Sequence, residues 1–581
     1  MVRTVYPTRL PNGSLLLNNM LDYEMVPLGS TFRSLTSSAS SFFSSLLLFW
    51  LCQVKVCERK MFETNFTSLD WGIVIVYLVG TGILGMFVNK YIHNASDYLV
   101  GGRSAGTSLS IASFIGTGLG LVTLMYASMG GFNKGFSFLL VPTIAFVAYI
   151  MLGSTGFVIK RLREMKLTTL PEFFEKRFSR KVRVTSGIIA VLAGILNMGI
   201  FPKMGAIFIT YVTGMGGEQS ELTVNIITSL LIVLVLVYTV MGGMVAVMVT
   251  DYIQFVVLSI GLGLGLWFCF NSPGLGWDEM VTTWSKAKGA AAFNPVHEKS
   301  YGWTYLFFQI FVITFAGFCW APEATRALTT ENSSTTKKTF LFGAPGFFVR
   351  MAIPAVWGIA AFVFVSKHPE LKDVFFGKEP IHAAAAMPLL LGNVIPMGLL
   401  GLLVAGLLAA FMSTHDSYLL SWASIISQDI IAPLKRVDRL SDQESIFFTR
   451  VSVVVIGAFL LFWGIWYELP ESVWDYMSIT GTVYVAGSGV ALIGGMYWKR
   501  ASSTGALLSM FGGLFAILGL KPIVEPTQFF LDSRLHSKCE YWLNGYSISL
   551  SVFGICALLF IFGSLAFPDK QQPATLEGEI S

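Results

Sequence analysis

Long runs of apolar, uncharged residues recur along the chain, and short polar segments separate them. About thirteen of these runs are long enough for an α-helix to cross a bilayer, which takes about 20 residues. They lack the short alternating pattern of membrane-spanning strands. The pattern therefore predicts an all-α polytopic membrane protein with about 13 transmembrane helices. The predicted spans centre on Trp71–Val88, Gly106–Met129, Gly135–Ile159, Val184–Val212, Leu222–Val240, Val247–Phe270, Tyr301–Cys319, Leu341–Val365, Met397–Ile426, Val451–Tyr467, Val473–Met496, Gly505–Leu520 and Ser547–Phe567.

The composition supports a membrane protein and argues against a soluble one. Of the 581 residues, 54% are hydrophobic and only 13% are charged, and the mean hydropathy is +0.67. The net charge of +5 does not indicate a nucleic-acid partner, because the basic residues lie in short segments between the spans. The six cysteines are scattered and predict neither a disulfide framework nor a metal site. The expected surroundings are the lipid bilayer.

The basic residues also predict how the chain crosses the membrane. The connection at residues 160–183 is rich in lysine and arginine, which marks it as cytoplasmic by the positive-inside rule. Every second segment between spans is also basic, including the one with Arg326, Lys337 and Lys338. With an odd number of spans, this pattern places the N-terminus outside and the C-terminus in the cytoplasm of a multi-pass cell-membrane protein.

Residues 1–68 differ from the rest and are expected to form an N-terminal extension. The segment is rich in serine, leucine and asparagine, and its one apolar run, Phe42–Cys52, is too short to span a membrane. A secretory signal is the alternative, but no small-residue cleavage site follows cleanly. The stretch before Met61 is therefore expected to be dispensable or a start-site artefact. The transmembrane domain is then 69–567, and a short cytoplasmic tail follows at 568–581.

A polar group inside the ninth predicted span is the best candidate for a binding site. Four polar residues fall within about one helical turn there, Ser413, Thr414, Asp416 and Ser417. Together with Ala410, three of them repeat at a spacing of three or four residues and share one helix face. Their hard oxygen atoms suit a small alkali cation. The alternative is that the hydroxyls only bond to their own helix or to a neighbour. The carboxylate favours a site, because an aspartate inside a membrane is costly and usually functional.

Two other predicted spans contain residues that interrupt helices. The second span has Gly116, Gly118 and Gly120 close together, and the seventh has Gly317 and Pro322. Interrupted spans at corresponding positions of two halves are typical of transporters with inverted repeats, which bind their solute at these breaks. The alternative for the first group is that glycine lets two membrane helices pack closely. The paired positions favour unwinding in both spans.

Four stretches in the expected order resemble the sodium:solute symporter family, which includes sodium/proline, sodium/glucose, sialic acid and pantothenate carriers. They are YLVGGRSAG at 98–106, YTVMGGMVAVMVTDYIQ at 238–254, LLAAFMSTHDSYLLSWASIISQDI at 407–430 and GGMYWKRASSTGAL at 494–507. The resemblance covers essentially residues 69–567. It implies a leucine-transporter-like core of five plus five helices in inverted repeat, with one helix before the core and two after it.

The resemblance also implies two cation sites. Transferred by motif, the family's core sodium site falls on three backbone carbonyls and two hydroxyls, those of Gly116, Leu119, Ala410, Ser413 and Thr414. A second cation site, present in some members, falls on Asp251, Asp416 and Ser417. Two carboxylates around one ion repel each other, so either a bound cation neutralises them or one stays protonated. The alternative for Asp251 is that it caps the start of the sixth span. His415 points to a different helix face and is interpreted as a packing residue.

Candidates for solute binding come from polar residues in other spans, Thr123, Asn197, Lys203 and Gln309, with Arg350 as a further candidate. Lys203 is notable because an ammonium inside a membrane needs an anion. The alternative is that it snorkels or pairs with Glu323. The polar amide and acid pattern expected around a sugar is not obvious in the second span. This slightly favours an organic acid or an amino-acid-like solute.

These observations predict a sodium-coupled secondary active symporter that imports a small organic solute by alternating access, as a monomeric transport unit. Sodium is the coupling ion and not a prosthetic group. The alternative is a solute-sensing receptor built on the same fold, but the residues after Phe567 contain no signalling module. The protein is not expected to be an enzyme, because no nucleophile motif or phosphate-binding loop stands out. A channel is not expected either, because it would need a continuous polar pore and not a binding site in the middle of the membrane.

Overall fold

The computed structural model describes residues 62–88, 94–217, 220–241, 243–297, 302–378, 380–437, 439–535 and 543–569. In these ranges the regular structure is helical, and the only β-type pairing is an isolated bridge between Ala105 and Thr330. The predicted all-α fold class is confirmed. Most of the N-terminal extension predicted at 1–68 and of the tail predicted at 568–581 lies outside the described residues, so these domain boundaries remain predictions.

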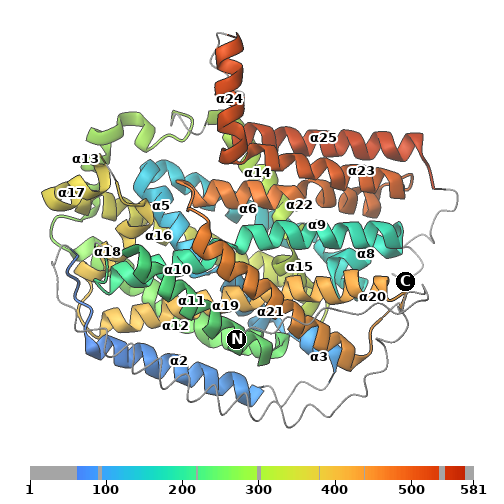
Figure 1. Cartoon of the computed structure of the whole chain (residues 1–581), viewed down its shortest axis with the longest axis horizontal. Helices are drawn as coiled ribbons and strands as arrows, with labels where there is room; N and C mark the ends of the chain where they lie inside the picture. The colour runs from blue at the N-terminus through green and yellow to red at the C-terminus, as the bar shows by residue number, and fades with distance from the viewer. Residues whose placement is uncertain are drawn as a thin grey trace, which may run out of the picture. The chain divides into compact units, whose positions relative to one another are not determined.

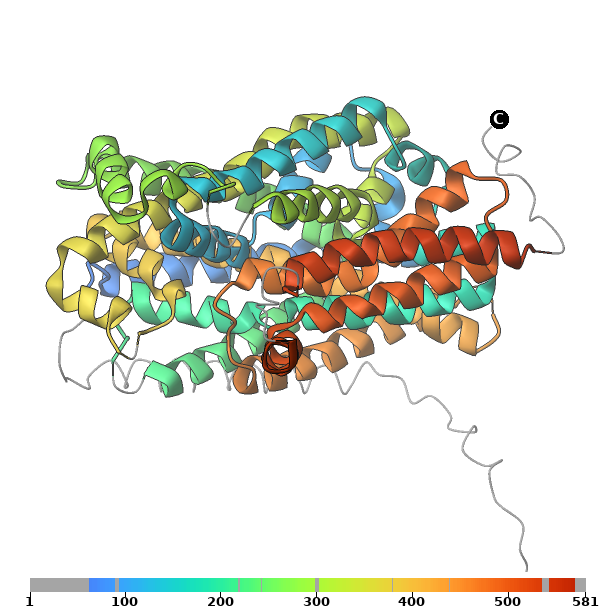
Figure 2. The same ribbon diagram turned by 90° about the horizontal axis from the view of Figure 1, so that it is seen from above.

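Most of the long helices lie side by side in one bundle (Figure 1). Their bounds are α2 (Ser68–Val88), α4 (Thr107–Gly118), α5 (Leu121–Lys134), α6 (Leu140–Thr155), α9 (Arg180–Met198), α10 (Phe201–Val212), α11 (Ser220–Met241), α12 (Met244–Asn271), α14 (Gly302–Cys319), α15 (Ala321–Thr329), α16 (Ser333–Lys367), α18 (Ala386–Val394), α19 (Leu399–Ile425), α21 (Asp442–Trp466), α22 (Val473–Tyr497), α23 (Ser503–Gly513) and α25 (Gly545–Ala566). Shorter helices connect them, α3 (Ala95–Val100), α7 (Ile159–Glu164), α8 (Leu170–Arg177), α13 (Trp277–Lys288), α17 (Pro369–Phe376) and α20 (Ala432–Leu434). The last connecting helix, α24 (Lys521–Leu535), leaves the bundle at a steep angle and is seen end-on in Figure 2.

The number of spans differs from the predicted count. Among the described residues, ten helices are long and apolar enough to cross a membrane, or eleven if the bent pair at Ser503–Gly519 and Lys521–Asp532 is one span. About thirteen were predicted. One reason is that α5 and α6 continue as one segment, Leu121–Thr155, through a short 3-10 turn, while α4 with only 12 residues is too short to count. Another is that the first predicted span corresponds to a shorter apolar helix, Ser68–Thr81. Apolar runs do not show where a helix breaks, so counting them overestimates the number of continuous spans.

Both predicted interruptions are confirmed. Helix α4 ends at Gly118, Leu119 leaves the helical region with φ −96° and ψ 58°, and α5 begins at Leu121. Helix α14 ends at Cys319, Trp320 is extended, and Pro322 lies in the first turn of α15. Proline suits that turn because its missing N–H group would have no partner there. The breaks free backbone polar groups inside the bundle, where a ligand can use them.

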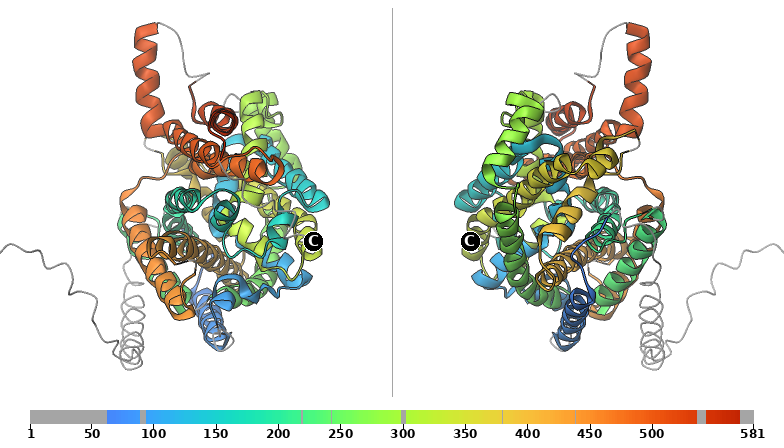
Figure 3. Two further views of the ribbon diagram at one scale, coloured as in Figure 1. Left: turned by 90° about the vertical axis from the view of Figure 1, so that its right-hand side faces the viewer. Right: turned by 90° about the vertical axis from the view of Figure 1, so that its left-hand side faces the viewer.

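Helix α19 lies in the interior of the bundle and passes the first break. Its residues from Leu403 to Ile425 are all buried. A Cβ atom added to Gly120 would lie 2.3 Å from the Oγ1 atom of Thr414. Only glycine therefore allows α19 to approach the break this closely. The end-on views in Figure 3 show helices surrounding this interior on several sides.

Helix α16 crosses α5 with almost direct backbone contact. A Cβ atom added to Gly131 would lie 2.0 Å from the carbonyl oxygen of Ala355, and one added to Gly358 would lie 1.9 Å from that of Ser128. Small residues permit such close approach of membrane helices, which then gain dispersion contacts along their length. This contact fixes the position of α16, which carries Arg350, relative to the first helix break.

Candidate ion and solute site

The predicted core sodium ligands come from two elements that meet at the first helix break. Thr414 donates a hydrogen bond from Oγ1 to the carbonyl oxygen of Thr117 at 3.2 Å, which ties α19 to the last turn of α4. Gly116 precedes Thr117 and Leu119 follows it by two residues, and the Leu119 N–H donates to the Gly116 carbonyl oxygen, with 3.2 Å between nitrogen and oxygen. Ala410 is buried one turn earlier on α19. The structure thus brings Thr414 to the turn of α4 that contains Gly116 and to the break at Leu119.

The second hydroxyl of this group, that of Ser413, donates a short hydrogen bond to the carboxylate of Asp251 on α12. A hydroxyl that gives its hydrogen to an acceptor still has lone pairs for a cation. The same argument holds for Thr414, whose hydrogen goes to a backbone carbonyl. Both hydroxyls therefore keep lone pairs that a sodium ion can use.

Asp251 lies inside α12 and does not cap it. The helix begins at Met244 with Gly243 as its N-cap, so the alternative of Asp251 as a capping residue is wrong. Its carboxylate is fully buried and accepts a hydrogen bond from Ser113 Oγ at 2.7 Å, in addition to that from Ser413. It also forms an ion pair with Arg326 on α15, at 3.1 Å between Oδ2 and NH2. Asp251 therefore joins α4, α12, α15 and α19.

Arg326 was assigned from the sequence to a basic segment between spans, and this assignment is wrong. Its side chain is only 2% exposed and lies inside the bundle. The positive-inside rule counts charges along the chain and contains no information on burial. A signal was nevertheless present, because Arg326 follows Glu323 by one helical turn directly after a proline-broken span. A short helix after such a break points its side chains at the binding region.

The residues predicted for a second cation do not share one set of contacts. Ser417 Oγ accepts a hydrogen bond from Arg326 NH2 at 2.6 Å, so Ser417 and Asp251 have the same cationic partner. Asp416 instead accepts a short hydrogen bond from Thr239 on α11, and its Oδ2 atom has no partner among the described residues. His415 contacts the carbonyl oxygen of Phe411 through Nδ1 at 2.7 Å, and its ring packs against the Phe411 ring, as expected for a packing residue.

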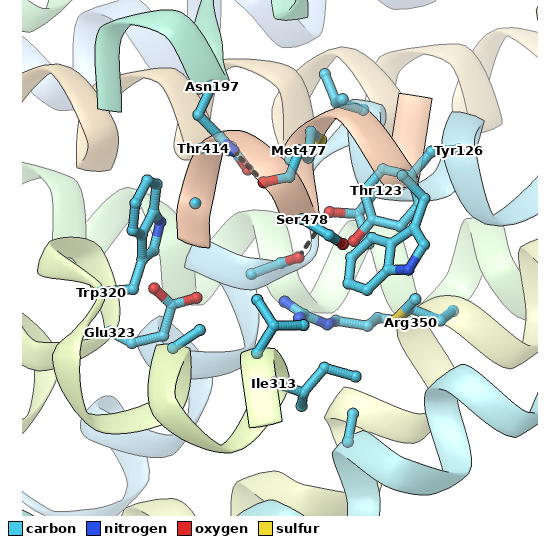
Figure 4. A pocket seen from close by; sticks show the side chains of 18 of the residues that line it. Thr123, Tyr126, Asn197, Ile313, Trp320, Glu323, Arg350, Thr414, Met477 and Ser478 are labelled. Atoms are coloured by element: carbon cyan, nitrogen blue, oxygen red, sulfur yellow. Dashed lines mark hydrogen bonds between the residues drawn. The ribbon is translucent and has the colours of Figure 1, made fainter. Parts of the chain in front are cut away.

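A cavity of about 110 Å³ lies beside both breaks, and residues of α4, α5, α6, α9, α10, α14, α15, α16, α19 and α22 line it. Two of the predicted solute-binding residues line it, Thr123 and Asn197. Thr123 donates a hydrogen bond to the carbonyl oxygen of Gly118 at 3.0 Å. Asn197 donates to the carbonyl oxygen of Met477 at 2.8 Å and to Thr480 Oγ1 at 3.0 Å. Thr414 also lines this cavity, so the proposed ion ligands and the cavity share a wall (Figure 4).

The other two predicted residues, Lys203 and Gln309, are not among the residues that line the cavity. Lys203 donates a hydrogen bond from Nζ to the carbonyl oxygen of Tyr467 at 2.9 Å and does not pair with Glu323. Gln309 is fully buried in α14, and neither atom of its side-chain amide has a hydrogen-bond partner in the described structure. Linear sequence does not show which face of a buried helix meets the cavity.

Two charged side chains of opposite sign face the cavity, Arg350 from α16 and Glu323 from α15 (Figure 4). The guanidinium of Arg350 lies 3.9 Å from the ring centre of Phe347, and it occupies the space that a side chain at Gly118 would take. Its Nε atom and the Oε2 atom of Glu323 have no hydrogen-bond partner among the described residues. The sequence indicated Arg350 as a candidate for solute binding, but it indicated Glu323 only as a partner of Lys203.

Comparison with known proteins connects this site to a transporter family. The chain is 26% identical to the sodium/sialic acid symporter SiaT of Proteus mirabilis, over 79% of this chain and 90% of that protein. It is 24% identical to the osmoregulated proline transporter OpuE of Bacillus subtilis, over 76% and 87%, and 25% identical to sodium/glucose cotransporter 4 of Danio rerio, over 79% and 72%.

The fold is also found among solved structures. A substrate-bound, outward-open Na⁺-coupled sialic acid symporter superposes with a TM-score of 0.69 at 21% identity, over 87% of this chain and 99% of that one. A family model of the sodium:solute symporters matches residues 98–513, which is well over half of the chain. The match includes all four of the sequence stretches, both helix breaks and the Ser413–Thr414 pair. The chain therefore belongs to the sodium:solute symporter family.

Proposed function

We propose that this sodium-coupled carrier imports an amino-acid-like solute, with a carboxylate and an ammonium group, through the cavity lined by Arg350 and Glu323. The observation that carries the proposal is the presence of one cationic and one anionic side chain on the same small cavity, with no ion pair between them in the described structure. Transport follows alternating access by a single chain, with the N-terminus outside and the C-terminus in the cytoplasm.

The chemistry of the two groups supports a zwitterion. An arginine guanidinium presents paired donors that match a carboxylate, and a glutamate accepts hydrogen bonds from an ammonium. A solute with both groups neutralises both side chains, whereas a sugar leaves two buried charges without partners. Residues on the cavity wall also have polar atoms without a hydrogen-bond partner in the described structure, Asn197 Oδ1, Ser478 Oγ and Trp474 Nε1, which suit additional neutral polar groups of the solute.

Sodium coupling in this proposal uses the five predicted core ligands, Gly116, Leu119, Ala410, Ser413 and Thr414. Hydroxyl and carbonyl oxygens are suitable ligands for a hard monovalent cation. Thr414 contributes to both the ion ligands and the cavity wall, so occupation of one site alters the other directly. The receptor alternative gains no support from the three relatives compared with this chain, which are all named as transporters.

Replacing Arg350 with glutamine should raise the half-saturating concentration of an amino-acid-like solute by at least about tenfold, because a hydrogen bond to a charged group contributes about 1.5–3 kcal/mol. The test is initial uptake of radiolabelled neutral amino acids, monocarboxylates and hexoses into proteoliposomes, with and without an inward sodium gradient. Glu323→Gln should impair neutral amino acids but spare monocarboxylates, which have no ammonium group.

Lys203→Gln is the matched control, because it removes an intramembrane cation that does not line the cavity. This variant should keep the parent's solute preference. Sodium-driven uptake of a hexose that is insensitive to both Arg350→Gln and Glu323→Gln would contradict the proposed solute class. A complete lack of sodium dependence for every solute in the panel would contradict sodium-coupled import itself.

A further inference from the structure

We propose that the guanidinium of Arg326 is a built-in cation at the position where the sequence predicts a second sodium ion, so that the carrier couples one sodium ion to each solute molecule. The inference rests on the proposed sodium-coupled import but concerns its stoichiometry. The inference starts from Arg326, a buried arginine that is neither one of the proposed sodium ligands nor one of the residues that line the solute cavity.

Arg326 has four partners on three helices, and its side chain is only 2% exposed. Its Nε donates to Thr117 Oγ1 on α4 at 2.7 Å, and NH1 contacts Met244 Sδ on α12 at 2.7 Å. Its NH2 donates to Asp251 Oδ2 on α12 at 3.1 Å and to Ser417 Oγ on α19 at 2.6 Å. A planar group with fixed donors, held from three sides, is a cation with a defined position.

These contacts use the oxygen atoms that a second sodium ion would need. One carboxylate oxygen of Asp251 and the hydroxyl of Ser417 both accept hydrogen bonds from NH2 of Arg326, and the other carboxylate oxygen accepts from Ser413. A free cation beside the guanidinium would be repelled by it, with little water to screen the charge. The guanidinium already provides the positive charge that Asp251 requires inside the bundle.

The third residue predicted for a second sodium lies outside this cluster. Asp416 accepts its hydrogen bond from Thr239 on α11, and the described structure has no hydrogen bond between Asp416 and Arg326, Asp251 or Ser417. The three predicted ligands are therefore divided between two groups of contacts. Only two of them have a common cationic partner, and that partner belongs to the chain.

The same arrangement gives Arg326 a positioning role at the core sodium site. The carboxylate of Asp251 is held by Arg326 and Ser113, and it then accepts the hydroxyl hydrogen of Ser413. This fixes the orientation of the Ser413 hydroxyl, so its lone pairs are available to the single sodium ion. A change at Arg326 should therefore affect sodium binding without any direct contact with sodium.

The test is the number of sodium ions bound and carried. Equilibrium binding of ²²Na⁺ to the purified full chain, and the ratio of ²²Na⁺ to labelled solute entering proteoliposomes, should both give a value near one for the parent. Arg326→Gln should raise the binding value above one, because Asp251 and Ser417 lose their resident cation, and should weaken the first sodium site at least tenfold. Arg326→Gln combined with Asp251→Asn should return the binding value to one.

Arg163→Gln is the matched control, because Arg163 is also buried but donates to the backbone carbonyl oxygens of Thr330 and Glu331, away from the predicted cation ligands. This variant should leave the sodium count at one. If Arg326→Gln does not insert, the sodium count of the parent and that of Arg326→Lys still test the inference. Both counts should be one, because lysine keeps the positive charge. A parent value near two that falls to one in Ser417→Ala would overturn the inference while leaving sodium-coupled import intact. A lack of any sodium-dependent uptake would instead contradict the proposed function.

Discussion

Replacing Ser413 and Thr414 together with alanine should abolish sodium-driven uptake while the protein remains folded and inserted. The change removes two of the five proposed sodium ligands, and each interaction with a charged group contributes about 1.5–3 kcal/mol. The apparent sodium affinity should therefore fall by at least about 100-fold. The helix itself should tolerate the change, because alanine has the highest helix propensity. Initial uptake measured against sodium concentration, with surface or membrane content quantified in parallel, gives the result.

A matched pair of hydroxyls is available further along the same helix. Ser421 and Ser424 donate hydrogen bonds to carbonyl oxygens of their own helix, at 2.7 Å to Ser417 and 2.6 Å to Leu420. The double variant Ser421→Ala with Ser424→Ala should keep the parent's sodium dependence, since it removes two hydroxyls from α19 that bond to none of the five proposed core sodium ligands. Equal loss in both double variants would indicate general damage to α19. Unchanged sodium dependence in the Ser413→Ala, Thr414→Ala variant would place the sodium site elsewhere.

The substitution Gly358→Ala should strongly destabilise the protein, although it adds only one methyl group. The added Cβ atom would lie 1.9 Å from the carbonyl oxygen of Ser128, a backbone atom that cannot move unless α5 and α16 separate. Overpacking of this kind costs about 3 kcal/mol, and the separation also displaces Arg350 from the cavity. We expect a lower melting temperature in detergent, a smaller monodisperse fraction and weaker solute uptake in those molecules that still insert.

Two helical glycines with free space provide the comparison. An added Cβ atom at Gly263 in α12 or at Gly554 in α25 meets nothing within 4 Å. Gly263→Ala and Gly554→Ala should therefore melt at or above the temperature of the parent, because alanine restricts the unfolded chain. If Gly358→Ala melted like these controls, the close contact between α5 and α16 would be disproved, and with it the placement of Arg350.

Local chemistry made part of the site predictable from the sequence. Glycine and proline act on the backbone around them, so the breaks at Gly116–Gly120 and at Pro322 were visible without knowledge of the fold. The hydroxyl pair on α19 was visible because helical spacing alone places its members on neighbouring faces. Features of this kind depend on residues within a few positions of each other.

Long-range contacts explain what the sequence did not reveal. Arg326 was misplaced in a loop because its partners, Thr117, Asp251 and Ser417, lie far from it along the chain. Lys203 was a candidate for solute binding because its partner, the carbonyl oxygen of Tyr467, is also far from it along the chain. A buried charge shows that a partner must exist, but a single sequence does not show which distant residue supplies it.

The position of Thr414 on the wall of the solute cavity has a thermodynamic consequence. If the presence of the solute stabilises the arrangement that binds sodium, the affinity for each increases by the same factor, because coupling between two binding equilibria is reciprocal. A single side chain then transmits free energy between the two ligands, without a relay through distant residues. In the proposed carrier, the solute would then bind more tightly on the side of the membrane where sodium is concentrated and more weakly on the side where sodium is scarce.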